Sequence, residues 1–487
     1  MASLSKKVFS GVFWKFSERI LAQLISFVVS VVIARILSPE DYGLVAMVMI
    51  FITIANVFVS NGFSTALIQK KEADYNDFTT LFYCSLFISI IFYFVLFFTA
   101  PLIARFYNKE ELVNLVKVFG LILPLSSYKS IQNAYVSKSL DFKKFFFSTL
   151  AGTIASGIVG IIMAVKGFGV WALVAQYFTN NIIDAIVLTF TIKWKPKFFF
   201  SFSKAKPLLS YGSRILLVDL IGTIYNQLTA FIIGKQYSST DLAFYTKGKQ
   251  LPDLINTNIS STITSVLFPA FSTSSDDYTE IKNMGRKAIK TSGYILLPFF
   301  FGLMAVSHNL INFLLTEKWL PCVIFVNIMC VNGIINTLDM IDIQVLKAIG
   351  KSNTVLKLEF IKKPIYLIVI FISMKINVYA LAISVPITSV IAIIANSHYI
   401  KKYIGYTLFE KIKDTGLSLL FSIIMYLSVF ALGYIKINTN ILLFIQIITG
   451  IIVYISLSVI TKNETMNYII SVLKKQKQND VPSEIDK

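Results

Sequence analysis

The stretch FSERILAQLISFVVSVVIARILSPEDYGLV, residues 16–45, contains the pattern that is repeated along this chain. Most of it is an apolar run of the length that a helix needs to cross a bilayer, about 20 residues. The polar turn SPEDY closes the run, and a second apolar run begins directly after it. Glu18 and Arg19 interrupt the apolar region and no A-x-A cleavage site follows, so we expect a retained membrane helix rather than a signal peptide.

The composition agrees with this pattern over all 487 residues. Hydrophobic residues make up 55% and charged residues 15% of the chain, whereas soluble domains average about 25% charged residues. This excludes an ordinary soluble enzyme and a disordered protein, because the charged residues are too few to cover a water-facing surface. The net charge of +19 is compatible with nucleic acid or a membrane surface. The apolar excess favours the membrane, so we expect no nucleic-acid partner.

Residues that bind metals or form disulfides are few and scattered. Cys84, Cys322 and Cys330 lie in apolar runs without CxxC spacing, and His308 and His398 lie far apart in the chain. Zinc, haem and iron–sulfur sites need clustered ligands at short spacings. We therefore expect no metal and no cofactor, and interpret the cysteines as small buried side chains.

Apolar runs long enough to span a bilayer, about fourteen in all, account for most of the chain. They lie at about 12–36, 43–68, 79–104, 112–136, 145–166, 169–192, 207–234, 242–270, 289–315, 322–346, 353–374, 378–400, 415–436 and 440–461. The predicted fold class is an all-α polytopic membrane protein. The loops are too short to form a catalytic domain outside the membrane, so we do not expect an enzyme.

The basic residues predict the orientation of these spans. With the N-terminus in the cytoplasm, about 27 lysines and arginines fall in inner segments and about 8 in outer loops. The inner connection at 401–414, for example, contains Lys401, Lys402, Lys411 and Lys413. Cytoplasmic loops carry an excess of Lys and Arg, so both termini are predicted to be cytoplasmic.

The chain also resembles itself at two places. The helix segment FSERILAQLISF and the loop SPEDYGLV have counterparts in YGSRILLVDLIG and SSTDLAFY, which align Arg19 with Arg214 and Asp41 with Asp241. Internal repeats are common in transporters, with the substrate path between the lobes. We expect two six-helix lobes, residues 1–193 and 205–400, followed by two helices at 415–461 and a cytoplasmic tail at 462–487.

Several ionisable residues lie inside the predicted spans, where each costs several kcal/mol unless it is paired or hydrated. We predict a cationic cavity that binds an anionic cargo, with Arg19, Arg214, Lys247 and Lys249 as its binding residues. Glu18, Asp219 and Asp253 are predicted to balance these charges or to carry a coupling proton.

Structural interpretations stand beside these assignments. Lys15, Glu18 and Arg19 have the spacing of a local ion-pair cluster, and Glu359 has the same spacing from Lys362 and Lys363. Asp339 and Asp342 lie near the inner end of their helix, where they can cap it or pair locally. Lys117 and Lys129 in the fourth run and Asp184 in the sixth are further intramembrane charges.

Three segments together resemble one family. They are ARILSPEDYGLVAM after the first helix, DLAFYTKGKQLPDLINTNISSTITSVLFPAFS in the eighth, and LKAIGKSN followed by LKLEFIKKP. The chain resembles the polysaccharide-transporter proteins of the multidrug/oligosaccharidyl-lipid/polysaccharide exporter superfamily, in the branch of Wzx-type flippases and of colanic- and teichuronic-acid exporters. The resemblance covers nearly the whole chain.

The resemblance implies two six-helix lobes around a cavity and two further C-terminal helices. It implies flipping of an undecaprenyl-diphosphate-linked oligosaccharide across the bacterial inner membrane, with Arg19 and Arg214 at the diphosphate. Membrane lipids, a polysaccharide polymerase and glycosyltransferases are the expected partners. One alternative is a cation-coupled multidrug antiporter of the same superfamily, which favours acidic cavities. A membrane glycosyltransferase or polymerase would need a large outer loop or a clustered acid and base, which the sequence lacks.

Overall fold

The computed structural model describes residues 2–274, 277–435 and 437–479, except for the side chains of residues 2–13, 61, 214, 261–262, 265–266 and 472–479. The chain divides into two compact units, Met1–Ala243 and Phe244–Lys487, which we call the first and second units and describe separately. The described residues form helices and no strands. The lobe boundaries expected from the repeat, including that between residues 193 and 205, remain a prediction.

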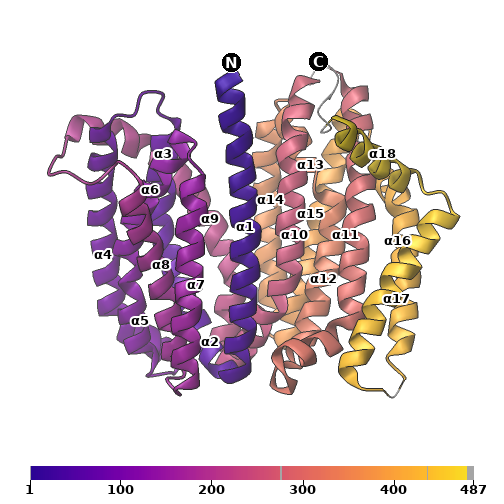
Figure 1. The fold of residues 1–487 in the computed structure, drawn as a ribbon, viewed down its shortest axis with the longest axis horizontal. Coiled ribbons are helices and arrows are strands. Elements are labelled where there is room, and N and C mark those ends of the chain that lie inside the picture. The colour runs from indigo at the N-terminus through magenta and orange to yellow at the C-terminus, as the bar shows by residue number, and fades with distance from the viewer. Residues whose placement is uncertain (1, 275–276, 436, 480–487) are drawn as a thin grey trace, which may run out of the picture. The chain divides into compact units, whose positions relative to one another are not determined.

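The first unit contains the helices of the N-terminal half of the chain, and its α4 to α8 are drawn side by side in Figure 1. Their bounds are α1 Ala2–Ile36, α2 Pro39–Asn56, the π-helical segment η1 Val57–Asn61, α3 Gly62–Gln69, α4 Tyr75–Tyr107, α5 Leu112–Gly120, α6 Ile122–Ser139, α7 Lys143–Val165, α8 Val170–Thr191 and α9 Phe202–Gln236. By its contacts, α9 packs against α2, η1, α3 and α4.

The second unit begins within α10 and continues to the C-terminus. Its helices are α10 Ser239–Thr273, α11 Tyr278–Leu315, the 3-10 helix η2 Glu317–Trp319, α12 Cys322–Asp339, α13 Asp342–Ala348, α14 Ser352–Ser373, α15 Val378–Ile404, α16 Leu408–Leu432, α17 Thr439–Ile460 and α18 Glu464–Asn479. The segment expected as a tail at 462–487 therefore contains a helix, and residues 480–487 lie outside the described residues.

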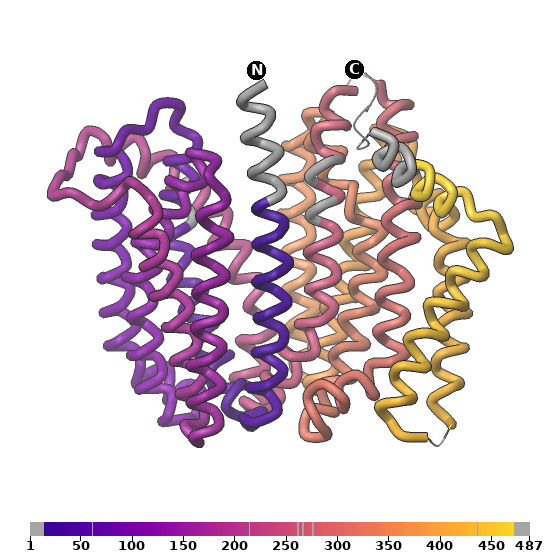
Figure 2. The backbone as a smooth tube through the Cα atoms, viewed as in Figure 1, coloured from indigo at the N-terminus to yellow at the C-terminus, as the bar shows by residue number. Residues whose placement is uncertain are grey.

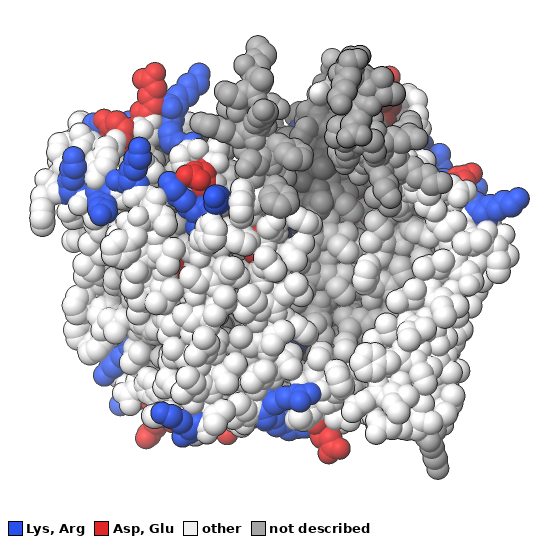
Figure 3. All heavy atoms as spheres, viewed as in Figure 1, with Lys and Arg blue, Asp and Glu red and all other residues white. Residues whose placement is uncertain are grey.

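Twelve helical segments of the described chain are long and apolar enough to cross a membrane, so the chain is a multi-pass membrane protein. The runs predicted at 242–270 and 353–374 form α10 and α14 but are not among the twelve. Both contain clustered charges, such as Lys247 with Lys249 and Glu359 with Lys362, which lower their hydropathy. The count of about fourteen spans therefore remains a prediction. On the face of the first unit shown in Figure 3, charged side chains gather at both ends of the helices and leave an apolar band between them.

The polar turns between apolar runs determine where helices begin. The aligned loops of the repeat have matching caps: Asp41 bonds the hydroxyl of Ser38 at 2.6 Å, and Asp241 bonds that of Ser238 at 2.6 Å. In both turns the serine oxygen accepts the main-chain N–H of the aspartate, which satisfies a free donor of the first helical turn. The aspartate anchor of the repeat, Asp41 and Asp241, thus has the same local structure at both places.

One turn of the first unit is wider than an α-helix. The π-helical segment Val57–Asn61 lies between α2 and α3, and such turns leave main-chain groups in need of other partners. Ser85 of α4 donates its hydroxyl to the carbonyl of Val59 at 2.6 Å, and Ser130 of α6 donates to the carbonyl of Ser60 at 3.0 Å. Directly after this segment, Gly62 passes so close to Gly212 of α9 that a Cβ on Gly62 would lie 2.5 Å from the Gly212 carbonyl oxygen.

The connection between α8 and α9 is fixed to the start of α4. Figure 2 shows it as a loop at the left edge of the first unit. Trp194 is fully buried there, with its ring 6.4 Å from that of Phe78 and 6.1 Å from that of Phe82. The hydroxyl of Tyr75 bonds the main-chain N–H and carbonyl of Lys195, and Lys204 pairs with Asp74, the cap of α4.

Candidate functional site

The predicted residues of α1 lie near a contact with α7. Glu18 pairs with Lys15 at 2.9 Å and accepts a hydrogen bond from Thr149 of α7 at 3.1 Å. The side chain of Glu18 is mostly buried, whereas that of Arg19 is exposed. The expected local pairing of Lys15 with Glu18 is confirmed.

The predicted residues of α9 are only partly described. Arg214 lies within the helix, but its side chain is outside the described residues. Asp219 is half-buried on the same helix. The predicted joint binding by Arg19 and Arg214 therefore remains a prediction.

The predicted residues of α10 differ sharply in burial. Lys247 is buried, with its ammonium 3.4 Å from the amide oxygen of Gln250 and 5.9 Å from the centre of the Trp319 ring. Lys249 is more exposed and pairs with Asp253 one turn away, at 3.8 Å. Of the predicted site residues, the structure thus brings together Lys249 and Asp253, and places Lys247 in the protein interior.

A second set of charges, in the second unit, is centred on fully buried side chains. We call it the buried charge network, and it consists of Asp339, Asp342, Glu359, Lys362, Asn396, Ser397 and Lys411. Lys411 of α16 and Asp342 of α13 are both 0% exposed and 2.5 Å apart. Lys411 also donates to the hydroxyl of Ser397 at 2.9 Å, so α13, α15 and α16 meet at this lysine.

The rest of the network lies beside this pair. Asn396 of α15 donates to both carboxylate oxygens of Asp339 at 2.9 Å and accepts a hydrogen bond from Lys362 at 3.3 Å. Lys362 also pairs with Glu359 at 2.7 Å, and Lys363 lies 3.9 Å from the same carboxylate. The expected pairing of Glu359 with these lysines is confirmed.

Sequence reasoning missed the central pair of this network. The inner connection expected at 401–414 is only residues 405–407 in the structure, and Lys411 lies inside the first turns of α16, where it is buried. Asp342 pairs with this lysine rather than only with neighbours along its own helix. The position of Asp339 and Asp342 in an apolar run indicated that these carboxylates need partners. Those partners could not be identified, because they lie more than fifty residues away in the chain.

The first unit has a smaller polar contact between α6 and α8. Lys129 pairs with Asp184 at 2.6 Å and lies 3.4 Å from the amide oxygen of Asn181. One turn further along, Gln132 donates to Thr189 at 2.8 Å, and Tyr128 shares a hydrogen bond with the same hydroxyl. Two of the intramembrane charges noted in the sequence are therefore partners of each other.

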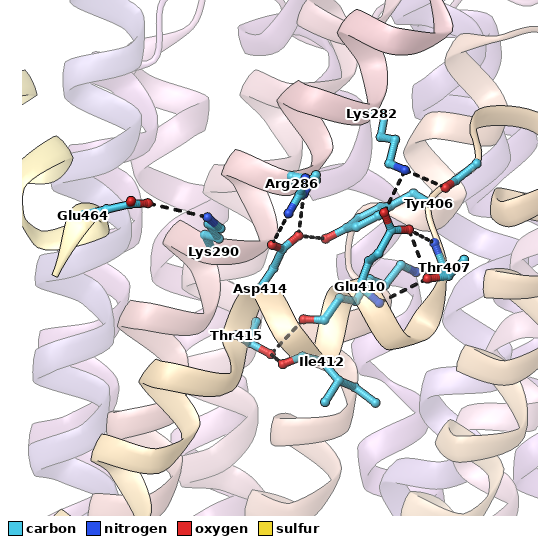
Figure 4. Close-up of polar contacts among 12 residues, drawn as sticks. Lys282, Arg286, Lys290, Tyr406, Thr407, Glu410, Ile412, Asp414, Thr415 and Glu464 are labelled. Atoms are coloured by element: carbon cyan, nitrogen blue, oxygen red, sulfur yellow. Dashed lines mark hydrogen bonds and ion pairs between the residues drawn. The ribbon is translucent and has the colours of Figure 1, made fainter.

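Ion pairs also join α11 to α16 at the start of both helices (Figure 4). The guanidinium of Arg286 binds Asp414 with two hydrogen bonds, of 2.9 and 2.7 Å, and Lys282 binds Glu410 at 2.8 Å. The hydroxyl of Tyr406 donates to Asp414 at 2.9 Å, and its burial together with this nearby carboxylate raises the pKa of Tyr406. These contacts stabilise the packing of α16 against α11.

Two further features bear on function. Among the described side chains, no group of three or more His, Cys, Asp or Glu residues is placed to hold a metal ion.

An open groove of about 640 Å³ lies between α4 and the connection to α9. It is lined by Tyr83, Cys84, Leu86, Phe87, Ile90, Phe198, Phe199 and Phe200.

Solved structures with the same fold are transporters. The fold resembles that of lipid II flippase MurJ in an inward closed conformation, with a TM-score of 0.72 and 18% identity, over 94% of this chain and 100% of that one. It also resembles an inward-facing multidrug resistance MATE family transporter of the MOP superfamily, with a TM-score of 0.63 and 15% identity, over 80% and 98% of the two chains. At these identities the likeness establishes the fold and not the cargo.

Curated relatives are named for polysaccharide biosynthesis. Lipopolysaccharide biosynthesis protein WzxC of Escherichia coli (strain K12) is 23% identical over 69% of this chain and 68% of its own length. Teichuronic acid biosynthesis protein TuaB of Bacillus subtilis (strain 168) is 23% identical over 72% and 74%. A family model described as polysaccharide biosynthesis protein matches residues 32–324, more than half of the sequence. The chain therefore belongs to the polysaccharide biosynthesis protein family, which confirms the resemblance found in its sequence.

Proposed function

We propose that this protein flips an undecaprenyl-diphosphate-linked oligosaccharide from the cytoplasmic to the outer leaflet of the bacterial inner membrane. The observation that carries the proposal is its membership of the polysaccharide biosynthesis protein family together with a fold shared with a lipid II flippase over 94% of the chain. The reaction is transport, without a bond made or broken. A polysaccharide polymerase and glycosyltransferases are the proposed partners in the same pathway.

The proposed orientation has both termini in the cytoplasm. It rests on the excess of lysine and arginine in alternate loops. Transport proceeds by alternating access, with lobes 1–193 and 205–400 rocking against each other around the cargo. Short loops and the matched turns at Ser38 and Ser238 support two related lobes.

The diphosphate is proposed to bind Arg19, Arg214 and Lys247. Arginine offers a planar fork to phosphate oxygens, which suits the first two positions. Lys247 is buried beside the amide oxygen of Gln250, and a phosphate of the cargo would attract its desolvated ammonium. Lys249 has a carboxylate neighbour in Asp253, so we assign this pair a weaker share of the binding.

The acidic residues are proposed to keep the empty cavity near neutral. Glu18 is held by Lys15 and Thr149, and Asp253 by Lys249. Asp219 is half-buried and is the proposed carrier of a coupling proton. This division follows from the local pairs, because Glu18 and Asp253 each lie beside a lysine ammonium.

Complementation of a deletion strain tests the function. We expect the strain to accumulate the lipid-linked oligosaccharide on the cytoplasmic face, and the wild-type chain to restore export. Arg19→Ala and Lys247→Ala should each lower export at least about tenfold at equal protein level, since each removes a charge–phosphate hydrogen bond. Arg19→Lys should restore export only in part.

Arg35→Ala is the matched control, because Arg35 lies in the last turn of the same helix as Arg19. It should export at the wild-type rate. Normal export by both Arg19→Ala and Lys247→Ala would place the cationic site elsewhere. Normal distribution of the lipid-linked oligosaccharide in the deletion strain, with altered resistance to cationic drugs, would favour the multidrug antiporter instead.

A further inference from the structure

The connection between α8 and α9 combines rigid placement with exposed aromatic side chains. Its anchor is Trp194, which is fully buried, and the hydroxyl of Tyr75, which bonds the main chain of Lys195. Four residues after Trp194, the side chains turn outward: Phe198 is fully exposed, and Phe199, Phe200 and Phe202 are exposed to lesser extents. Folding therefore fixes the main chain of this segment but leaves its phenylalanines uncovered.

Such exposure would be costly in water. A phenylalanine side chain is more favourable buried than exposed to water, and these four are nearly consecutive. Phe198 to Phe200 lie outside the candidate spans, between Thr191 and Phe202. Aromatic side chains at the edge of a spanning helix typically sit at the level of the lipid headgroups and upper acyl chains. These phenylalanines are thus placed to enter the membrane interface.

Phe198, Phe199 and Phe200 form one wall of the open groove of about 640 Å³, and the other wall is α4. Phe87 and Ile90 of α4 are exposed toward it, and Tyr83 and Cys84 supply its only polar atoms among the lining side chains. An open apolar groove beside a spanning helix fits an extended hydrocarbon chain.

The border of the groove carries positive charge. Lys193, Lys195 and Lys197 are exposed on the segment itself, and Lys206 is exposed on the first turns of α9. The nearby carboxylates are already engaged, because Asp77 pairs with Lys70 at 2.6 Å and Asp74 pairs with Lys204. The ammonium of Lys197 lies 4.7 Å from the centre of the ring of Tyr75, the first residue of α4. This contact holds the Lys197 side chain next to α4.

We propose that this groove binds one acyl chain of an anionic membrane phospholipid, whose phosphate is held by Lys195 and Lys197. Lysine acts as a point charge on phosphate and does not impose a bidentate geometry. That chemistry favours the general class of anionic phospholipids over a single diphosphate cargo. Clusters of basic residues directly beside a spanning helix attract anionic lipids by about 1 kcal/mol for each lysine. The proposal requires only that the chain is a membrane protein, so it stands or falls independently of the proposed cargo.

The native cysteines supply a probe for occupancy. Cys84 lines the groove and is half-buried, whereas Cys322 and Cys330 are fully buried. In the purified full-length protein in a neutral detergent, an apolar maleimide should modify Cys84 first. Both phosphatidylglycerol and phosphatidylcholine should slow this modification. At low salt each of the two lysines is expected to strengthen binding of the anionic lipid about fivefold, so phosphatidylglycerol should act at a concentration about 25-fold lower.

Three variants separate the contributions. Lys195→Gln/Lys197→Gln should abolish the preference for phosphatidylglycerol while leaving the rate without lipid unchanged. Phe198→Ser/Phe199→Ser/Phe200→Ser should weaken protection by both lipids. Lys401→Gln/Lys402→Gln is the matched control, because it removes two exposed lysines at the end of α15, in the second unit, and should behave as wild type.

Equal protection by the two phospholipids in the wild-type protein would overturn the proposal. So would a preference for phosphatidylglycerol that survives Lys195→Gln/Lys197→Gln. Purified undecaprenyl diphosphate should protect no better than phosphatidylglycerol. If it protects at a tenfold lower concentration, the groove belongs to the cargo and the assignment to membrane phospholipid is wrong.

Discussion

The two units each bury charge between helices, but they do so in different ways. In the first unit, Lys129 and Asp184 form one ion pair whose lysine is still 23% exposed, and the neighbouring contacts of Gln132 and Tyr128 are neutral. In the second unit, Lys411 and Asp342 are both 0% exposed and are embedded among further charged and polar partners. The same combination of lysine and aspartate therefore occurs in two environments.

The two ion pairs differ in how many of the hydrogen bonds made by water must be replaced by bonds within the protein. A partly exposed lysine keeps some of its hydration, so its ion pair can be simple. A fully desolvated pair must satisfy its remaining protons and lone pairs within the protein, or the desolvation penalty exceeds the Coulombic attraction. This explains why Ser397 also binds Lys411, and why Asn396 binds Asp339 through both carboxylate oxygens. The buried pair Lys411–Asp342 therefore lies within a network of further hydrogen bonds.

The largest effect is expected from breaking the fully buried pair. Lys411→Met leaves Asp342 without its cation, and an uncompensated buried charge typically costs about 3–5 kcal/mol of stability. Thermal denaturation of the purified protein in detergent should show the lower transition temperature. Lys413→Met, two residues further along α16 and exposed, should shift stability by less than about 0.5 kcal/mol.

The double variant Asp342→Leu/Lys411→Met sharpens this test. It removes both charges and should regain most of the lost stability, because a buried ion pair replaced by apolar residues is often neutral or stabilising. The comparison between units would be wrong if Lys411→Met were as stable as Lys413→Met.

A smaller loss is expected in the first unit. Lys129→Met removes the partner of Asp184, but this carboxylate lies near a lysine position that water already reaches. We expect a loss of about 1.5–3 kcal/mol, the range for a hydrogen bond to a charged group. The same denaturation measurement applies, with Asp184→Asn as the variant that retains hydrogen bonding. A loss as large as that of Lys411→Met would show that exposure does not set the difference.

The smallest effect is expected at an exposed pair outside the spans. The hydrogen bond from Lys204 lowers the pKa of Asp74 below its ordinary value. This pair therefore stabilises the fold above about pH 4, the unfolded pKa, and its contribution disappears as the pH falls through the lower folded value. Because the pair is exposed to solvent, its contribution is small.

Transition temperatures of wild type and Lys204→Gln, measured from pH 6 to about pH 3, should therefore converge toward acid. A difference that stays constant over this range would contradict a role for the charge of Asp74.

Much of the fold follows from local features of the sequence. Runs of apolar residues predict the helices, and polar turns such as SPEDY predict where they begin, because Ser38 and Asp41 satisfy free backbone donors there. Pairing at helical spacing is equally readable, as Lys15 with Glu18 and Lys362 with Glu359 confirm. These predictions succeed because all the interacting groups lie within one or two turns.

The parts that could not be predicted depend on contacts distant in the chain. The sequence around Lys411 reads as a polar loop because lysines and acids alternate there, yet packing against α13 and α15 buries this residue. The pairing of Lys129 with Asp184 likewise spans two helices. A single sequence gives the positions of such charges but not which of them meet.

The wide turn at Val57–Asn61 has a consequence for the azimuth of the helix that follows. Successive residues of an α-helix are rotated by about 100°, so a turn that accommodates one extra residue rotates everything after it by about that angle. Gly62, the first residue after this turn, faces Gly212 of α9. Ser85 of α4 and Ser130 of α6 bind the carbonyls of the wide turn. These two helices therefore help to set which face of α3 packs against α9.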